Sequence, residues 1–161
     1  MKRIFDTQLI GPFAAMVIVA VIVALTTERF LNPGNLSNLS LQVSIVALIA
    51  IGSTIVIFAA GIDLSSGSMV ALLTMILAQF LKFMGIPLSL AVPMILIVGG
   101  VLGLFIGIIT AYGRIPSFIT TLAGLIAFRG MALTFNNGSP IFSLDPALEP
   151  IFYGKLAGVT L

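Results

Sequence analysis

Long apolar runs fill most of this 161-residue chain and limit the folds that are open to it. The runs are Leu9–Leu25, Leu39–Ala60, Ser68–Phe83, Leu88–Tyr112 and Ile115–Phe135. A transmembrane helix needs about 20 predominantly apolar residues, and the third run is the shortest of the five. Whether residues 68–83 cross a bilayer fully is left open. The pattern predicts an all-α, polytopic membrane protein with about five transmembrane helices.

The composition supports a membrane protein and excludes several classes of enzyme. Hydrophobic residues make up 60% of the chain and charged residues 7%, whereas a soluble domain is about 25% charged. The mean hydropathy is +1.28. The net charge of +2 rests on too few groups to indicate a nucleic-acid partner. Because Cys and His are both absent, the chain lacks thiolates, disulfides and the commonest general base and metal ligand.

The basic residues give a weak preference for one orientation in the membrane. With the N-terminus inside, the inner side holds Lys2, Arg3 and Arg114, and the outer side holds Arg29, Lys82 and Lys155. The N-terminal pair breaks this tie, because the first helix usually dominates topology. We therefore expect a cytoplasmic N-terminus. Residues 1–161 are expected to form a single transmembrane domain in which residues 136–161 are an extracytoplasmic loop or tail.

A polar segment separates the second apolar run from the third. It reads Gly-Ile-Asp-Leu-Ser-Ser-Gly over residues 61–67, and Asp63 is the only acidic residue between Glu28 and Asp145. An ionisable group near membrane depth is costly and indicates a function or a partner. Two interpretations are compatible. Asp63 or a neighbouring serine can cap the following helix, with Gly61 and Gly67 permitting the turn. The broken helix can also line a route for substrate.

The candidate residues fall into three sets. The substrate pathway and its motif are predicted to include Gly61, Asp63, Ser65, Gly67, Ser68, Gln42 and Asn137. For Gln42, a hydrogen bond to a neighbouring helix is the simpler alternative. Gly99, Gly103 and Gly107 recur every four residues, which predicts a smooth helix face for close packing. Arg114 is predicted to be an anchor at the cytoplasmic face or a contact for a cytoplasmic partner.

Two further segments carry basic residues near the ends of runs. In Gly113–Leu122, Gly113 is expected to let one helix end, and Pro116 stands where the next helix would start. Arg129 lies near the far end of the fifth run, from which its side chain can reach the headgroups. A partner across helices, or the polar end of a translocation path, is the alternative for Arg129.

These motifs together resemble one family of transporters. The string Gly-Ile-Asp-Leu-Ser-x-Gly-Ser at residues 61–68 is similar to the hallmark of the sugar-transporting ABC permeases of the ribose permease type. The segments 29–36, 113–122, 129–130 and 137–140 follow in the order and spacing of that family. The resemblance covers roughly residues 9–161. Ser66 stands where the family often has Val, which adds polarity without disturbing the fold.

The resemblance implies the membrane-spanning permease subunit of a bacterial ATP-driven importer for a simple sugar such as ribose or xylose. It implies a location in the bacterial inner membrane. The partners would be a cytoplasmic ATP-binding subunit, a periplasmic sugar-binding protein and a second, identical or homologous permease subunit. Such a permease is not an enzyme and needs no catalytic residue, cofactor or metal, since ATP hydrolysis belongs to the separate ATPase subunit.

The family's members are considerably longer, so the chain resembles an N-terminal half: a truncated gene, a fragment or one part of a split permease. The same permease type acting on another small polar solute, such as a nucleoside or a signalling sugar, is one alternative. A truncated remnant that does not transport is another. An integral-membrane enzyme is disfavoured because Asp63 has no second acid, base or metal ligand near it in the sequence.

Overall fold

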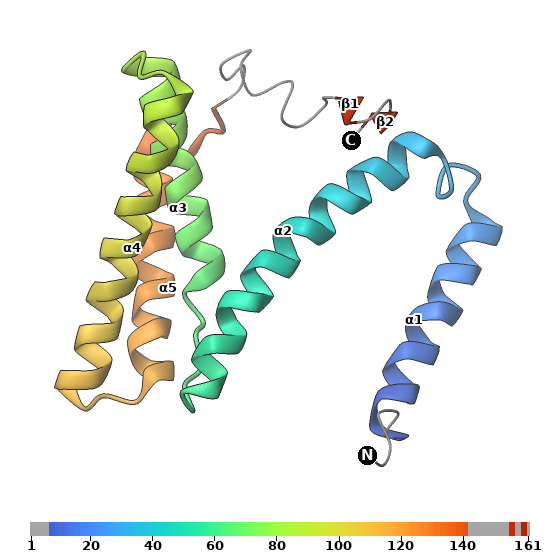
Figure 1. Cartoon of the computed structure of the whole chain (residues 1–161), viewed down its shortest axis with the longest axis horizontal. Coiled ribbons are helices and arrows are strands. Elements are labelled where there is room, and N and C mark those ends of the chain that lie inside the picture. The colour runs from blue at the N-terminus through green and yellow to red at the C-terminus, as the bar shows by residue number, and fades with distance from the viewer. Residues whose placement is uncertain (1–6, 142–154, 157–158, 161) are drawn as a thin grey trace. The chain divides into compact units, whose positions relative to one another are not determined.

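The computed structural model describes residues 7–141, 155–156 and 159–160, with side chains described over residues 10–141. Its main elements are helices (Figure 1): α1 (Thr7–Thr26), α2 (Pro33–Phe58), α3 (Ser66–Ala78), α4 (Leu88–Gly113) and α5 (Ser117–Thr134). A π-helical turn, η1 (Gln79–Phe83), continues α3, and a 3₁₀ turn, η2 (Phe135–Gly138), continues α5. The two-residue strands β1 (Lys155–Leu156) and β2 (Val159–Thr160) pair antiparallel, with Lys155 opposite Thr160.

The predicted apolar runs and the observed helices agree closely. Four helices in the described part of the chain are long and apolar enough to cross a membrane: Pro33–Phe58, Ser66–Phe83, Leu88–Gly113 and Ser117–Gly138. The described part of α1, Ile10–Thr26, is a shorter apolar helix. The fold class of a polytopic helical membrane protein is therefore confirmed, with four qualifying helices where about five were expected.

The third run proves longer than its composition suggested. Helix α3 begins at Ser66 and passes directly into the π-helical turn that ends at Phe83, which gives a continuous helical segment of 18 residues. At a rise of about 1.5 Å per residue this segment is about 27 Å long, close to the roughly 30 Å of a bilayer's hydrocarbon core. It is therefore a candidate span in its own right.

The chain divides into two units, residues 1–44 and residues 45–161. The first unit contains α1 and the first part of α2. The apolar side chains of this unit, such as Phe13 and Ile18 of α1, are mostly exposed. Lys2 and Arg3, on which the predicted orientation depends, lie outside the described residues. The cytoplasmic N-terminus and the extracytoplasmic position of residues 136–161 therefore remain predictions.

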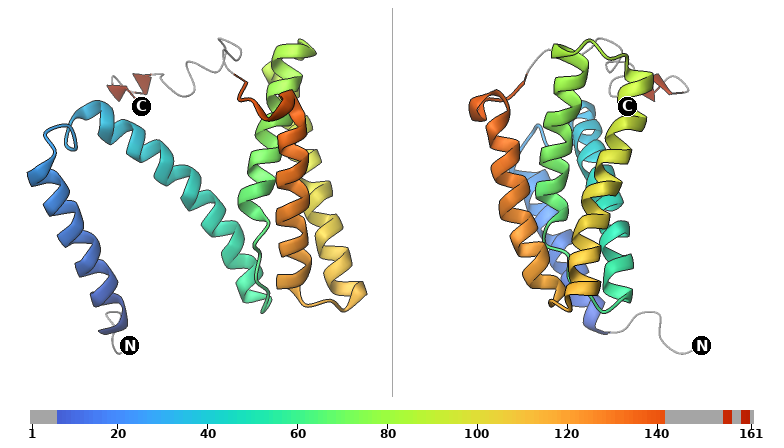
Figure 2. Two further views of the ribbon diagram at one scale, coloured as in Figure 1. Left: turned by 180° about the vertical axis from the view of Figure 1, so that it is seen from behind. Right: turned by 90° about the vertical axis from the view of Figure 1, so that its left-hand side faces the viewer.

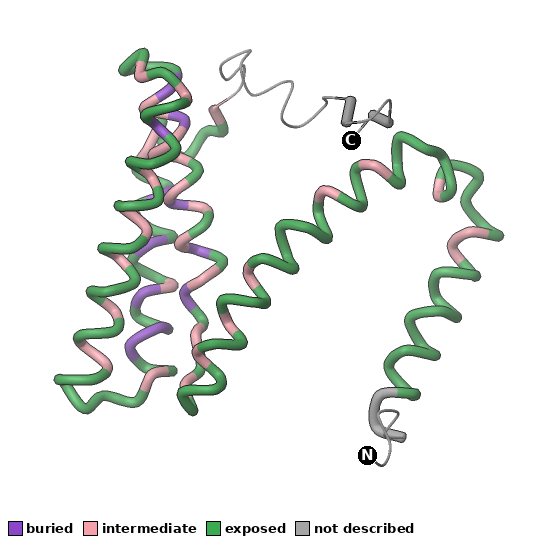
Figure 3. The backbone as a smooth tube through the Cα atoms, in the orientation of Figure 1, coloured by how far each residue is buried: buried purple, intermediate pink, exposed green. Residues whose placement is uncertain are grey.

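The second unit contains a bundle of three helices in which α3, α4 and α5 run alternately up, down and up (Figure 2). Helix α3 packs most extensively against α5. Leu72, Phe128 and Ala132 are the buried core between them, and the buried positions gather on these two helices (Figure 3). On the outer faces, large apolar side chains such as Leu96 and Ile126 are exposed, as expected for helices that meet lipid.

Candidate functional site

Helix α2 ends in a tight left-handed turn directly before the Gly61–Ser68 segment. The Gly61 amide donates to the Val56 carbonyl (2.9 Å), and the Ala60 amide donates to the Ile57 carbonyl (2.9 Å). This pair of bonds is a Schellman motif, which requires left-handed backbone at its penultimate position. Ala60 occupies that position with a φ of 57°. The turn is therefore made by Ala60, and the expectation that Gly61 supplies it is wrong.

Gly61 is required for space. A Cβ atom at Gly61 would lie 3.0 Å from Val56 Cγ1 and 3.2 Å from the Val56 carbonyl oxygen. Gly67, by contrast, lies in the first turn of α3 without positive φ, and a Cβ there would meet nothing within 4 Å. The predicted turn-forming role of Gly67 is therefore not what the structure shows.

Asp63 organises the chain immediately before α3. Its Oδ1 accepts hydrogen bonds from the Ser65 amide (2.8 Å) and from Ser65 Oγ (2.7 Å). A side-chain oxygen that bonds the amide two residues later forms an Asx turn. Ser65 is the N-cap residue of α3, but its side chain makes no capping bond. Asp63 therefore positions the N-cap residue instead of capping the helix amides directly.

The Ser65 backbone anchors the first turn of α3. The Ser65 carbonyl accepts bonds from the Met69 amide (2.8 Å) and from Ser68 Oγ (2.8 Å). The side chain of Ser65 is only 1% exposed and that of Ser68 is also buried. Asp63, Ser65 and Ser68, which were grouped from the sequence, therefore form one connected hydrogen-bonded turn.

The same segment is held by α5, although the two are more than fifty residues apart in sequence. The Ile62 amide donates to Ser117 Oγ (2.9 Å), and Thr121 Oγ1 donates to the Ile62 carbonyl (3.1 Å). Ser117 and Thr121 lie one helical turn apart and therefore on one face of α5. We call Ile62, Ser117 and Thr121 the Ile62 clamp. Both backbone polar groups of Ile62 are satisfied by α5 through this clamp.

The Thr121 hydroxyl shares its one proton between the Ile62 carbonyl and its own helix. It also lies 2.8 Å from the Ser117 carbonyl of its own helix, which is the usual internal partner of a helical threonine. Thr121 is buried and the Ile62 side chain is 56% exposed, so this hydrogen bond lies at the edge of the apolar bundle. Leaving the Ile62 carbonyl unpaired in apolar surroundings would cost about 1–3 kcal/mol.

Gly124 lets α5 approach the start of α3 next to the clamp. A Cβ atom there would lie 3.2 Å from Ser65 Cβ and 3.0 Å from Ile106 Cδ1 of α4. No role was predicted for Ser117, Thr121 or Gly124 from the sequence. A pattern of Ser, Thr and Gly at spacings of four and then three residues on one helix face was the signal that could have identified them.

The remaining predicted site residues lie elsewhere. Gln42 is an exposed residue of the first unit. Asn137 is exposed in η2, at the end of α5 opposite to the clamp, with left-handed backbone (φ 51°). Arg114 is exposed at the C-terminal cap of α4 and has a φ of 53°. Arg114, and not Gly113 as expected, is therefore the residue that turns the chain from α4 towards α5.

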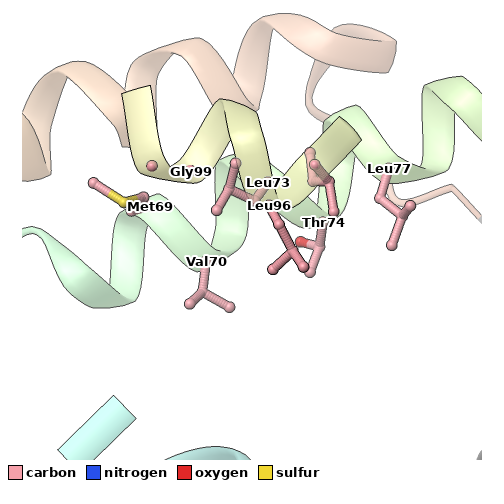
Figure 4. A pocket seen from close by; sticks show the side chains of 9 residues that line it. Met69, Val70, Leu73, Thr74, Leu77, Leu96 and Gly99 are labelled. Carbon is pink, nitrogen blue, oxygen red and sulfur yellow. The ribbon is translucent and has the colours of Figure 1, made fainter. Parts of the chain in front are cut away.

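The predicted glycine face of α4 is engaged at one of its three positions within the described residues. A Cβ at Gly99 would lie 3.0 Å from Leu73 Cδ1 of α3, whereas Cβ atoms at Gly103 and Gly107 would meet nothing within 4 Å. Gly99 borders an apolar groove of about 460 Å³ between α3 and α4 (Figure 4). The groove is lined by Met69, Val70, Leu73, Thr74, Leu77, Ile95, Leu96, Gly99 and Gly100. Close packing at Gly103 and Gly107 stays a prediction.

Comparison with known proteins identifies related sequences. Residues 35–145 match the family described as "Branched-chain amino acid transport system / permease component". The chain is 38% identical over 129 residues to the ribose import permease protein of Haemophilus influenzae, which covers 80% of this chain and 40% of the relative. It is 37% identical over 156 residues to the xylose transport system permease protein of Escherichia coli, which covers 96% of this chain and 40% of that relative.

The matched region includes both segments that the Ile62 clamp joins. The ribose import permease protein of Escherichia coli is 36% identical over 129 residues, or 79% of this chain and 39% of its own length. This chain therefore spans about two fifths of the length of these curated relatives. No solved structure matches the chain.

Proposed function

Because the chain belongs to the family of branched-chain amino acid transport system permease components, we propose that it forms part of the permease of a bacterial ATP-driven importer for a simple sugar such as ribose or xylose. The observation that carries this proposal is the 36–38% identity to permeases named for ribose and xylose. The apolar helices of a membrane protein agree with such a role.

The proposed solute is inferred from the named relatives more than from the description of the family. The description of the family refers to branched-chain amino acids, which makes such an amino acid the second candidate. Relatives at 36–38% identity are named for two different pentoses, and they favour a pentose. Ribose and xylose are uncharged and rich in hydroxyl groups, so a weakly polar route with few ionised groups is sufficient for them.

The Ile62 clamp gives this proposal a structural basis. A permease must change the exposure of its route while its helices remain connected. The clamp joins the break between α2 and α3 to the start of α5, so these elements would move together. We propose that the segment 61–68, with Asp63 at its centre, borders the route or transmits movement to it.

The proposed assembly contains further subunits. A cytoplasmic ATP-binding subunit would hydrolyse ATP, and a periplasmic binding protein would deliver the sugar. A second permease subunit, identical or homologous, would complete the route. The proposed location is the bacterial inner membrane, with the N-terminus in the cytoplasm.

An exchange experiment tests the function. This chain replaces the region that it matches in the xylose permease of Escherichia coli, in cells that lack the native permease but keep the other components of that system. We expect saturable uptake of labelled xylose or ribose that is lost when the ATP-binding subunit is deleted. Unlabelled leucine should not compete.

Membrane abundance is measured in parallel through an epitope tag. A chimera that reaches native abundance but takes up neither pentose would contradict the proposal. Uptake of leucine in place of the pentoses would support the second candidate.

A further inference from the structure

Arg129 is a charged residue on an otherwise apolar stretch of α5. It lies five residues before Thr134, the last residue of the helix, and its side chain is exposed. The described part of the chain offers it no hydrogen bond or ion pair, and residues 64–141 contain no Asp or Glu. A guanidinium in this setting attracts an anionic group, because a cation near membrane depth needs a counter-charge or water.

A pocket of about 240 Å³ opens beside Arg129, between α3, α5 and the turn that follows η2. Its apolar wall includes Ala71 and Met75 of α3 and Ala132 of α5, and its polar residues include Arg129, Thr74 and Ser139. Both helices belong to candidate membrane spans. The pocket therefore combines an apolar wall with a positive edge, which suits an amphipathic ligand that has an anionic head.

The hydrogen bonds around the pocket indicate which groups can bind an anion. Thr74 Oγ1 donates to the Ala71 carbonyl (2.9 Å), so its proton is already used. The Ser139 backbone is fixed, because its amide donates to the Asn136 carbonyl (3.0 Å) and its carbonyl accepts from Asn136 Nδ2 (3.1 Å). The Ser139 hydroxyl makes no bond within the described residues. Among the polar side chains that line the pocket, Arg129 and Ser139 are thus the donors without a bond to another described residue.

A lipid is a better occupant than a soluble anion on physical grounds. Leu133 also lines the pocket, and its side chain is 51% exposed. Other apolar side chains on α5 are exposed as well, so the opening of the pocket lies in an apolar environment. An arginine near the end of a span extends its head towards the phosphates while its stem stays among apolar groups. Guanidinium and phosphate also form strong, often bidentate, hydrogen bonds.

We propose that the pocket between Arg129 and Ser139 binds the phosphate of an anionic phospholipid, with the lipid's glycerol and upper acyl carbons against the Ala71, Met75 and Ala132 wall. This site depends on the chain's being a membrane protein and is independent of the solute that the permease carries. Its failure would leave the proposed function untouched.

Native mass spectrometry of the full chain in neutral detergent tests the site. The chain is titrated with phosphatidylglycerol or with phosphatidylcholine of identical acyl chains. We expect preferential retention of phosphatidylglycerol, and Arg129→Gln should reduce that preference by roughly tenfold, as expected for loss of a hydrogen bond between charged groups. Ser139→Ala, a mild change in an exposed turn, should reduce it less. Circular dichroism checks that the variants remain helical.

Arg29→Gln is the matched control, because Arg29 is also an exposed arginine near a helix end but lies outside the pocket. It should keep the preference of the unaltered chain. Equal losses in Arg29→Gln and Arg129→Gln would mean a general charge effect and would overturn the site. Displacement of the lipid by millimolar inorganic phosphate would overturn the lipid assignment. If Arg129→Gln fails to fold, an unchanged preference in Ser139→Ala would itself contradict the proposal.

Discussion

Single hydroxyl and carboxylate groups hold the segment between α2 and α3. Asp63 fixes Ser65, while Ser117 and Thr121 bind the Ile62 backbone from another helix. Each of these groups pairs a polar atom that lies in or beside an apolar bundle. The contribution of each hydrogen bond to stability is therefore measured by removing one partner, which leaves the other polar group unpaired.

Thr121→Val removes the clamp's hydroxyl and keeps the side chain's shape. We expect the free energy of unfolding to fall by about 1–3 kcal/mol, because the Ile62 carbonyl loses its donor. Thr110→Val is the control, since among the described residues the Thr110 hydroxyl bonds only the Ile106 carbonyl of its own helix (2.9 Å). Thermal unfolding in detergent, followed by circular dichroism, should show a clearly larger loss for Thr121→Val. Equal losses would mean that the clamp adds nothing.

Replacements at Asp63 can separate its charge from its hydrogen bonds. Asn keeps a side-chain oxygen that can form the same Asx turn, whereas Ala cannot. We expect Asp63→Asn to change stability by less than about 0.5 kcal/mol and Asp63→Ala to cost about 1 kcal/mol. If the carboxylate serves transport, Asp63→Asn in the xylose-permease chimera should still lower uptake at equal abundance. Native uptake by Asp63→Asn would limit Asp63 to a structural role.

At the scale of the element, the ends of the helices are determined by the backbone conformation of single residues. The C-terminal turns of α2 and α4 both place a non-glycine residue, Ala60 or Arg114, in left-handed backbone. The neighbouring glycines, Gly61 and Gly113, have ordinary backbone instead. Such a left-handed residue costs roughly 1–2 kcal/mol, which surrounding contacts such as the Ile62 clamp must offset.

Opposite changes at two adjacent residues test the end of α2. Ala60→Gly should raise the free energy of unfolding by up to about 1 kcal/mol, because glycine enters left-handed backbone without strain. Gly61→Ala should lower it by about 1–3 kcal/mol, since its Cβ would press on the Val56 backbone. Urea or thermal titration of both variants in one detergent gives the comparison. A stabilising Gly61→Ala would refute the close approach.

The glycine face of α4 gives a second test at this scale. Gly99→Leu should destabilise the isolated chain by about 1–3 kcal/mol through contact with Leu73. Gly103→Leu should leave the isolated chain unchanged, because nothing described lies within 4 Å of that position. In an assembled permease, however, we expect Gly103→Leu to reduce complex yield if this face meets another helix. Thermal unfolding in detergent measures the stability of the isolated chain, and size-exclusion chromatography measures the yield of the complex. Normal assembly of Gly103→Leu would mean that this face meets lipid.

At the scale of the whole molecule, the exposed apolar surface and the few charges define a membrane protein. The ends of the second unit's bundle differ in character. The clamp and Arg114 lie at one end of α5, and Arg129, Asn137 and Ser139 lie towards the other. Which end faces the cytoplasm depends on the orientation of the chain.

Reporter fusions test that orientation. With a cytoplasmic N-terminus, a fusion at Arg114 should be active only with a reporter that works in the cytoplasm. A fusion after Ser139 should be active only with a reporter that works in the periplasm. The excess of Lys2 and Arg3 before the first span is the physical reason, since basic residues near span ends favour the cytoplasmic side. The reverse activities at both sites would invert the topology.

The sequence by itself determined the membrane class and the positions of the helices. Runs such as Leu88–Tyr112 predicted α4 almost to the residue, because hydrophobic length is a local property that lipid translates directly into a helix. It also identified Asp63 and its serines as one unit, because an Asx turn depends only on neighbouring residues.

Only the tertiary structure decided that Ile62 is held by Ser117 and Thr121, that Ala60 forms the left-handed turn, and that Gly99 but neither Gly103 nor Gly107 meets a described neighbour. These features depend on which helix lies beside which. Within an apolar span, every face offers nearly the same hydrophobicity, so periodicity cannot select the neighbour. Close approach at small residues and a few interhelical hydrogen bonds make that choice, and both require the folded coordinates.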